Sequence, residues 1–248
     1  MTTPSGTGTA PGAPTRERVA EFEAIGVTAF TTTRALGDFS LAEPATLEAN
    51  TARWNDLQRA LTPGHVGLVS ALQVHGVTIA EHAEPRTGWT RIEGVDAHLV
   101  RTPAIAAAVT VADCVPAFVA HPSGVVAMVH AGWRGTAARL IEQVIARVAA
   151  AGLEPGDLYV HLGPAVCGRC YEVGPDVYER LTGWQTTRHR NVDLRALLAE
   201  QAKSAAVGHL SASAYCTRCD NDRFFSHRAG DIGRQVSVIV SPLREWPN

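Results

Sequence analysis

Several segments of this chain are apolar almost without interruption, and this pattern restricts the fold more than any other feature. Ile105–Val111 and residues 125–130 are short, rich in valine and alanine, and bounded by turn residues. A strand that is apolar at nearly every position is buried on both faces, whereas a strand on a solvated sheet alternates apolar and polar residues. Further strands are predicted at residues 25–33, 66–74, 77–80, 97–100, 158–162, 212–216 and 234–241. The sequence therefore predicts sheets that are covered on both sides.

Helical periodicity accounts for the covering layers. Apolar side chains recur with a helical period in residues 43–61 and 136–152, and shorter helices are predicted at residues 175–181 and 193–207. Because strands and helices mix without strict βαβ alternation, we expect an α/β or α+β sandwich with mixed sheets. No repeat or linker divides residues 16–248, which predicts a single domain. Residues 1–15 are rich in Thr, Gly and Pro and are expected to form a disordered tail.

Charge and hydropathy exclude several classes of protein. The formal net charge is −2 and 46% of the 248 residues are hydrophobic, so binding to nucleic acid or to an anionic membrane is not expected. No apolar stretch reaches the ~20 residues that a transmembrane helix needs, and the features of a signal peptide are missing. These observations predict a cytoplasmic protein. Its five cysteines are then candidate ligands, nucleophiles or core residues before they are candidate disulfides.

Three motifs place a soft metal ligand at the tip of an apolar strand. The motifs are QVHG, ADCVP and VHAGWRGT, and the ligands are His75, Cys114 and His130. Two imidazoles and one thiolate would give zinc three protein ligands and leave a fourth position open, which is typical of a catalytic metal. Their spacing matches no local zinc signature. The alternative is that Cys114 is a small buried hydrophobe and that both histidines are hydrogen-bonded turn residues.

The third motif also predicts an anion site. Gly132 and Gly135 permit close approach of a ligand to the backbone, and Arg134 lies between them. A helix predicted from about Thr136 directs its N-terminus to the same place, an arrangement that suits phosphate. The alternative is an ordinary strand–turn–helix connection with a solvated arginine.

Two C-x2-C pairs lie far apart in the sequence. The two pairs could close around a structural zinc ion, form a redox site, or occur in loops by coincidence. We expect one zinc ion per chain, at the open site, because the sequence does not fix the loops that carry the pairs. A second zinc ion is the alternative, held by Cys167, Cys170, Cys216 and Cys219.

A further group of residues combines aromatic and polar side chains. Glu172 follows Tyr171, and Ser226 and Arg228 follow a Phe-Phe pair. Such residues could line a pocket that stacks a flat heterocycle while Arg228 holds an anion. Buried aromatic side chains are, however, more often part of the core.

Four segments together resemble the laccase-domain (multicopper polyphenol oxidase-like) family. They are QVHG, DAHLVRTPAIAAAVTVADCVPAFVAHPSGVVAMVHAGWRGT, LGPAVCGRCYEVG and YCTRCDNDRFFSHRAGDIGRQVSVI, in the order of the family. Members of this family are described as zinc-dependent purine nucleoside phosphorylases, and some are named peptidoglycan editing factors. The resemblance implies a single-domain, four-layer α/β/β/α sandwich with mixed sheets. It also implies that His75, Cys114 and His130 hold zinc.

The activity that the resemblance implies is phosphorolysis of purine nucleosides. Adenosine, inosine, guanosine or methylthioadenosine would react with phosphate to give the free base and a pentose 1-phosphate, and adenosine would also be deaminated. Arg34, Asn50 and Arg53 fit positions in the family's pattern. The residues expected to contact substrate or phosphate are Arg34, Asn50, Gln73, Arg134, Ser226 and Arg228, and the candidate catalytic residues are Asp113, Cys114 and Glu172. Asp113 and Glu172 are the candidates for proton transfer. Nucleosides and phosphate are the expected partners, and a homodimer is left open.

A four-copper oxidase and a metal-free hydrolase are the two rivals to purine nucleoside phosphorolysis. A four-copper oxidase needs about ten histidines arranged in His-x-His pairs, and the ten histidines of this chain include no such pair. A metal-free hydrolase or amidase that edits cell-wall precursors is the stronger rival, with Cys114 as nucleophile and a histidine as base.

Overall fold

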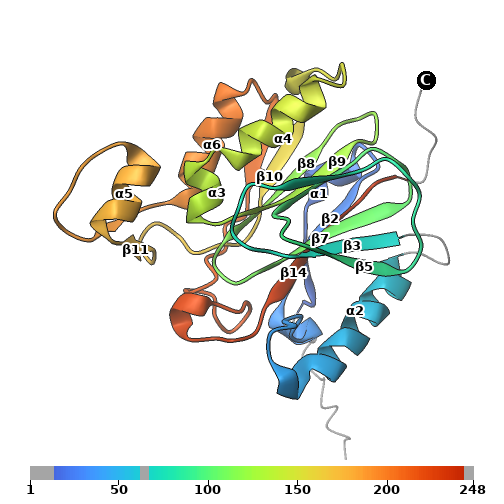
Figure 1. Ribbon diagram of the computed structural model, residues 1–248, viewed down its shortest axis with the longest axis horizontal. Coiled ribbons are helices and arrows are strands. Elements are labelled where there is room, and N and C mark those ends of the chain that lie inside the picture. The colour runs from blue at the N-terminus through green and yellow to red at the C-terminus, as the bar shows by residue number, and fades with distance from the viewer. Residues whose placement is uncertain (1–13, 62–66, 243–248) are drawn as a thin grey trace, which may run out of the picture.

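Two six-stranded sheets form the centre of the computed structural model, which describes residues 14–61 and 67–242 (Figure 1). The first sheet has the order β1 (Arg16–Arg18), β2 (Thr28–Thr32), β14 (Gln235–Val240), β7 (Ile105–Val111), β3 (Gly67–Leu72) and β5 (Trp89–Glu93). The second has the order β13 (His209–Ala212), β10 (Tyr159–Leu162), β8 (Val115–Ala120), β9 (Val126–Ala131), β6 (Ala97–Val100) and β4 (Ile79–His82). Both sheets combine parallel and antiparallel pairs, as the sequence predicts.

The strands are apolar on both faces because each sheet lies between two layers. In β7, Ala107 and Val109 face the second sheet, where they share a cluster with Phe118. The alternate residues Ala106 and Ala108 face outward and pack with the helix described next. Successive side chains of a strand point to opposite faces, so a strand between two apolar layers has no polar position.

Helices cover the outer face of each sheet (Figure 1). Helix α2 (Leu47–Leu61) buries Trp54 and Leu57 against the first sheet, and Trp54 stacks on Trp89 with ring centroids 5.0 Å apart. On the second sheet, α4 (Leu140–Ala149) and α6 (Leu194–Ser204) bury a continuous apolar stripe. The order helix, sheet, sheet, helix confirms the predicted four-layer α/β/β/α sandwich.

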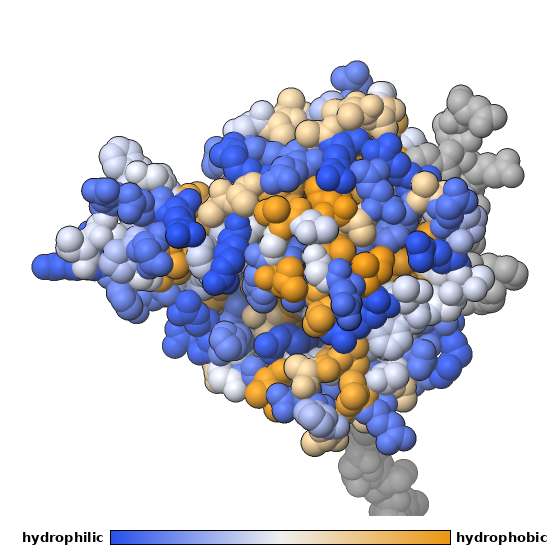
Figure 2. Space-filling model, in the orientation of Figure 1, coloured by the Kyte–Doolittle hydropathy of each residue, from blue (hydrophilic) through white to orange (hydrophobic). Residues whose placement is uncertain are grey.

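The remaining elements are short. They are α1 (Ala20–Glu23), α3 (Trp133–Ala137), α5 (Pro175–Thr182), the two-stranded ribbon β11 (Glu172–Val173) and β12 (Arg190–Asn191), and the 3-10 turns η1 (Arg34–Leu36), η2 (Pro44–Thr46), η3 (Pro155–Asp157) and η4 (His227–Ala229). Helix α5 projects from the body, and Figure 2 shows that its surface is largely hydrophilic whereas apolar side chains gather at the centre of this face. No helix in the described part of the chain is long and apolar enough to cross a membrane.

The structure corrects several predicted elements. The helix expected over residues 136–152 is two helices, because Arg139 adopts a left-handed conformation (φ 57°) between α3 and α4. The sequence does not predict strands β1, β5 and β8. For β8 the reason is Pro116, because proline is unusual in a central strand. The strand predicted at residues 212–216 is β13, which ends at residue 212. Most of the predicted tail and the first residue of the strand predicted at 66–74 lie outside the described residues. The disordered tail therefore stays a prediction, and so does the single domain.

Candidate functional site

The structure brings together the side chains of His75, Cys114 and His130. One potential ligand atom from each lies within 4.8 Å of the others. His75 follows β3, Cys114 lies between β7 and β8, and His130 belongs to β9. Strands β3 and β7 are parallel, so their carboxyl ends meet at one edge of the sheet. The end of β9 in the second sheet completes the group, which is the ligand set that the sequence predicts.

Asp96, which sequence reasoning missed, supports this group from below. Its carboxylate accepts a hydrogen bond from Nδ1 of His130 at 2.9 Å and from the backbone N–H groups of His75 at 2.9 Å and Gly76 at 2.6 Å. Asp96 immediately precedes β6, whose first residue, Ala97, pairs with Val129 of β9. The antiparallel register of the two strands therefore places Asp96 beside His130. A carboxylate on one ring nitrogen directs the other nitrogen toward a ligand, as in many metal sites.

Two of the five non-glycine residues with a positive φ angle in the described part of the chain lie at this group. His75 and Asp113 have positive φ angles of 59° and 87°, which are uncommon for residues other than glycine. Gly132 leaves the necessary space, since a Cβ atom there would lie 3.0 Å from Sγ of Cys114 and 3.2 Å from Cδ2 of His75. Strained residues and close packing of this kind are typical of functional sites.

Cys114 and His130 each favour the charged form of the other. Burial by itself raises the pKa of the Cys114 thiol, but the charge of His130 and hydrogen bonds to His130 and His75 lower it to about 6. Burial lowers the pKa of His130, but the Cys114 thiolate and Asp96 raise it to about 9. The thiol is therefore ionised at neutral pH, and a thiolate is the form that binds metals or attacks electrophiles.

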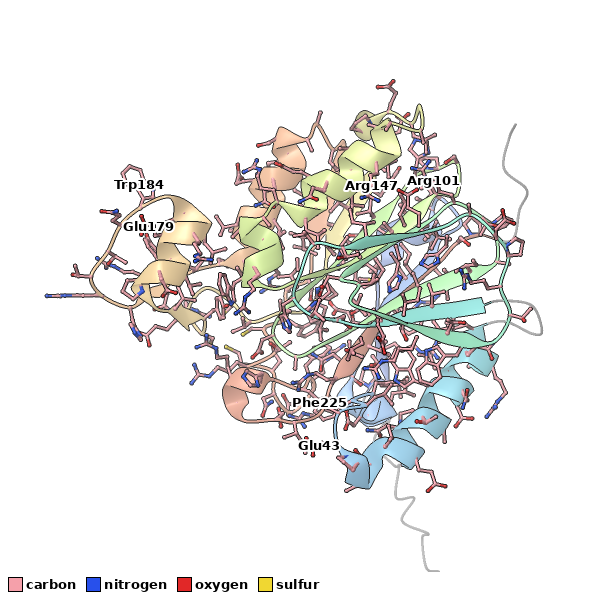
Figure 3. All side chains as sticks on the ribbon, in the orientation of Figure 1. Glu43, Arg101, Arg147, Glu179, Trp184 and Phe225 are labelled. Atoms are coloured by element: carbon pink, nitrogen blue, oxygen red, sulfur yellow. The ribbon has the colours of Figure 1, made fainter. Side chains whose placement is uncertain are left out.

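A cavity of about 930 Å³ opens above these three residues. The loop of residues 39–43, the carboxyl ends of β3 and β7, the start of α3 and residues 227–234 line it. Figure 3 shows Phe225 and Glu43 close together in the lower part of the molecule. Leu72 and Ile232 line the cavity and stay 44% and 67% exposed. The volume is that of a site for a small organic ligand.

Two predicted arginines line the cavity. Arg134 lies in the first turn of α3, with its guanidinium 4.4 Å from the ring centroid of Trp133. Helix α3 begins at Trp133 rather than near Thr136 and has five residues, so the anion would meet the arginine rather than the dipole of a long helix. The guanidinium of Arg228 lies 4.7 Å from the ring centroid of Tyr171. Burial, together with the charge of Cys114, raises the pKa of Tyr171 despite Arg228.

Asp113 joins the cavity to the segment that carries Arg228. Its carboxylate accepts hydrogen bonds from the hydroxyls of Thr217 at 2.6 Å and Ser226 at 2.7 Å, and from the backbone N–H of Arg228 at 2.6 Å. Ser226 is fully buried and does not line the cavity. Asp113 and Ser226 thus hold the loop in place through contacts that the sequence did not indicate.

The other predicted contact residues lie in different surroundings. Gln73 lines the cavity, but its amide spans to β7, donating to the carbonyl of Thr110 at 2.9 Å and accepting from its N–H at 2.8 Å. Asn50 is buried behind the loop of residues 39–43 and donates to the carbonyl of Ser40 at 2.7 Å. Glu172 is exposed on β11, outside the lining of the cavity.

Arg34 also lies outside the cavity lining and holds the neighbouring loop. It donates to the carbonyl of Asn221 at 2.6 Å, forms an ion pair with Asp231 and covers the ring of Phe225 at 4.4 Å. The hydrogen bond from Arg34 lowers the pKa of Asp231 to about 2, despite partial burial.

Replacing Arg34 with methionine is therefore expected to make the free energy of unfolding decrease less as the pH is lowered. A carboxyl group with a lowered pKa stabilises the fold above its ordinary pKa, near 3.8, and this contribution is lost as the pH falls towards 2. The difference in the free energy of unfolding between wild type and Arg34→Met should thus narrow between about pH 4 and pH 2. Urea unfolding across this range tests it, with the exposed Arg180→Met as control. A constant difference would contradict the prediction.

The two C-x2-C pairs, which lie far apart in the sequence, come together in the structure. The sulfur atoms of Cys167, Cys170, Cys216 and Cys219 all lie within 4.8 Å of one another. They and the His75, Cys114 and His130 group are the groups of candidate metal ligands found among residues 14–61 and 67–242. Within those ranges the structure assembles no cluster of histidines such as a four-copper centre requires.

The fold and the site define a class of protein: a two-sheet α/β/β/α sandwich with an open three-ligand site in a cavity that carries arginines. Residues 28–242 match the family described as "Multi-copper polyphenol oxidoreductase laccase", and the chain belongs to this family.

Proteins that are similar to this chain carry different names, as three examples show. A protein of Deinococcus radiodurans named "Purine nucleoside phosphorylase" is 37% identical over 184 residues, 70% of each chain. A protein of an unknown prokaryotic organism named "Adenosine deaminase RL5" is 35% identical over 153 residues, covering 55% of this chain and 58% of that one. The crystal structure of Bacillus licheniformis hypothetical protein YfiH shares the fold, with a TM-score of 0.83 at 24% identity over 93% of this chain and 97% of that one.

Proposed function

We propose that this protein is a zinc-dependent purine nucleoside phosphorylase that also deaminates adenosine. The observation that carries the proposal is the open ligand set of His75, Cys114 and His130 in a cavity that also holds Arg134 and Arg228. The names of the similar proteins, one a phosphorylase and one a deaminase, support both activities. The proposed substrates are adenosine, inosine, guanosine and methylthioadenosine.

The residues present fit a zinc ion. Two imidazoles and a thiolate are ligands that zinc prefers, and three protein ligands leave a position for substrate. Asp96 fixes the orientation of His130, and the left-handed backbone of His75 brings its ring to the same point. When bound, zinc supplies Lewis-acid chemistry that polarises an oxygen atom or lowers the pKa of water.

Two of the four arginines that line the cavity, Arg134 and Arg228, are proposed to bind phosphate. Arg134 and Arg228 both lie on its wall, and each is held over an aromatic ring, Trp133 or Tyr171, which restricts the conformation of a long side chain. Guanidinium groups recognise phosphate through paired hydrogen bonds. Positioned beneath the anomeric carbon, phosphate would attack as the glycosidic bond weakens.

The exposed apolar residues of the cavity are proposed to bind the base. Leu72 and Ile232 lie on the cavity wall, where a flat purine would cover them from water. Asp113, Ser226, Asn50 and Arg34 are assigned positioning roles, because their polar groups are bonded to the chain itself. Glu172 is not among the residues that line the cavity, whereas Glu43 and His227 are.

Base release from inosine should require phosphate. Replacing Arg134 or Arg228 with alanine should raise the KM for phosphate by about tenfold or more, because a charged hydrogen bond of about 1.5–3 kcal/mol is lost. The measurement is base and ribose 1-phosphate formed with and without phosphate. Arg180→Ala on α5, which lies outside the cavity, is the matched control. Adenosine deamination should change less. Equal base release without phosphate, with free ribose as product, would sink the proposal.

One observation favours a second function, a metal-free hydrolase. Cys114, His130 and Asp96 form a thiolate–imidazolium–carboxylate series like that of cysteine hydrolases. His75 has no place in such a triad, yet its ring packs against His130 with centroids 4.8 Å apart. Full activity on a nucleoside after removal of zinc by a chelator would favour the hydrolase, and loss of activity restored by zinc would favour the phosphorylase.

A further inference from the structure

Four cysteines outside the cavity form a second group of metal ligands. Cys167 and Cys170 come from one turn, and Cys216 and Cys219 from another. The turns lie next to each other because Ala165 pairs with Cys216 in a parallel bridge. We propose that these four sulfurs bind a structural zinc ion, distinct from the ion proposed for the cavity.

The spacing of the sulfur atoms is that of a tetrahedral site. With Zn–S bonds of about 2.3 Å, the sulfur atoms of a ZnS4 centre lie about 3.8 Å apart. The four sulfurs here lie within 4.8 Å of one another, and those of Cys170 and Cys219 are 3.5 Å apart. A small contraction around a cation would complete the geometry. Four thiolates leave no open position, which is typical of a structural rather than a catalytic zinc site.

The backbone of both turns is arranged to support thiolate ligands. The N–H groups of Cys167 and Cys219 donate to Sγ of Cys216, at 3.2 and 3.4 Å. Each turn closes in the same way, since the N–H of Tyr171 donates to the carbonyl of Cys167 and that of Asp220 donates to the carbonyl of Cys216. Hydrogen bonds to the sulfur stabilise the negative charge of a metal thiolate.

The position of the group indicates what the ion would do. Tyr171 follows the first turn directly, and its ring lies against Arg228 on the cavity wall. Thr217 lies within the second turn and donates to Asp113. A zinc ion would therefore tie the segment that carries Tyr171 to the segment that leads to Arg228, one of the two arginines proposed to bind phosphate.

Metal analysis of the full chain with and without one ligand tests this site. The cavity site is first disabled with His130→Ala, so that any zinc left is held elsewhere. This variant should retain one zinc per chain, and adding Cys170→Ser or Cys219→Ser should remove it. Arg169→Ala in the same turn is the matched control and should keep the metal. Cobalt(II) loaded into His130→Ala should show the visible bands of a tetrahedral thiolate complex.

The result does not depend on the proposed function. Zinc retained in His130→Ala and lost with Cys219→Ser, together with a Tm lower by several degrees, supports the structural site even if no nucleoside is cleaved. Three results would overturn it: no metal in His130→Ala that circular dichroism shows to be folded, iron in place of zinc, or a Cys170–Cys219 disulfide in protein purified under reducing conditions. Because Cys170 is only partly buried and Cys219 is exposed, serine at either position should be tolerated by the fold.

Discussion

Replacing His130 with alanine is expected to remove the metal from the cavity and to reduce nucleoside cleavage by more than about 100-fold. Loss of a residue that only orients a ligand typically costs 10–100-fold in metal affinity or activity, and loss of the ligand itself should cost more. His130 is 3% exposed and receives its orientation from Asp96. The measurements are bound zinc and the rate of base release at saturating phosphate.

Two further variants separate the loss of metal from a loss of folding. His130→Ala also leaves the buried carboxylate of Asp96 without its partner, which by itself destabilises the fold. His75 is exposed, and His75→Asn keeps a residue that tolerates the left-handed backbone at this position. Asp96→Asn keeps all ligands and should show an intermediate loss. Unchanged activity in a folded His75→Asn that has lost its zinc would contradict the prediction.

Phe118→Ala is expected to lower the free energy of unfolding by about 3–5 kcal/mol. The ring is fully buried between the sheets, in a cluster with Val109 and Met128, where backbone strands on both sides prevent collapse around the cavity that alanine would leave. Urea unfolding gives the difference, provided that one transition is observed.

Trp184 supplies the control for this substitution. It lies at the far end of the α5 projection and is 74% exposed (Figure 3). Trp184→Ala removes a larger ring but should change the free energy of unfolding by less than about 0.5 kcal/mol. A similar effect of both substitutions would mean that the layer between the two sheets is not the main source of stability.

The fold class could be predicted because it depends on patterns that a sequence displays directly. Apolar runs such as Ile105–Val111 require cover on both faces, and the period of Trp54 and Leu57 in α2 supplies one of the covers. The misplaced details depend on local exceptions. Pro116 hid β8, and nothing in the sequence around Arg139 indicates that it leaves the helical conformation.

The grouping of His75, Cys114 and His130 could be predicted because each lies at the end of an apolar strand, but its surroundings could not. Asp96 is the neighbour of His130 only through the register of β6 and β9, which is a property of the folded sheet. Arg34 and Asn50 matched a family pattern, yet the structure uses their polar groups to hold loops. A pattern of residue types does not distinguish a side chain that contacts a ligand from one that supports the wall behind it.

The position of β14 has a consequence for how the protein is made. This strand is the last in the described chain, yet it lies between β2 and β7 inside the first sheet. On the ribosome, about 230 residues therefore emerge before the strand that joins these two is available, and until then their facing edges carry unpaired backbone groups that can pair with other chains. Nascent chains of this protein should thus need protection from aggregation until β14 has been synthesised, because this strand pairs with both β2 and β7.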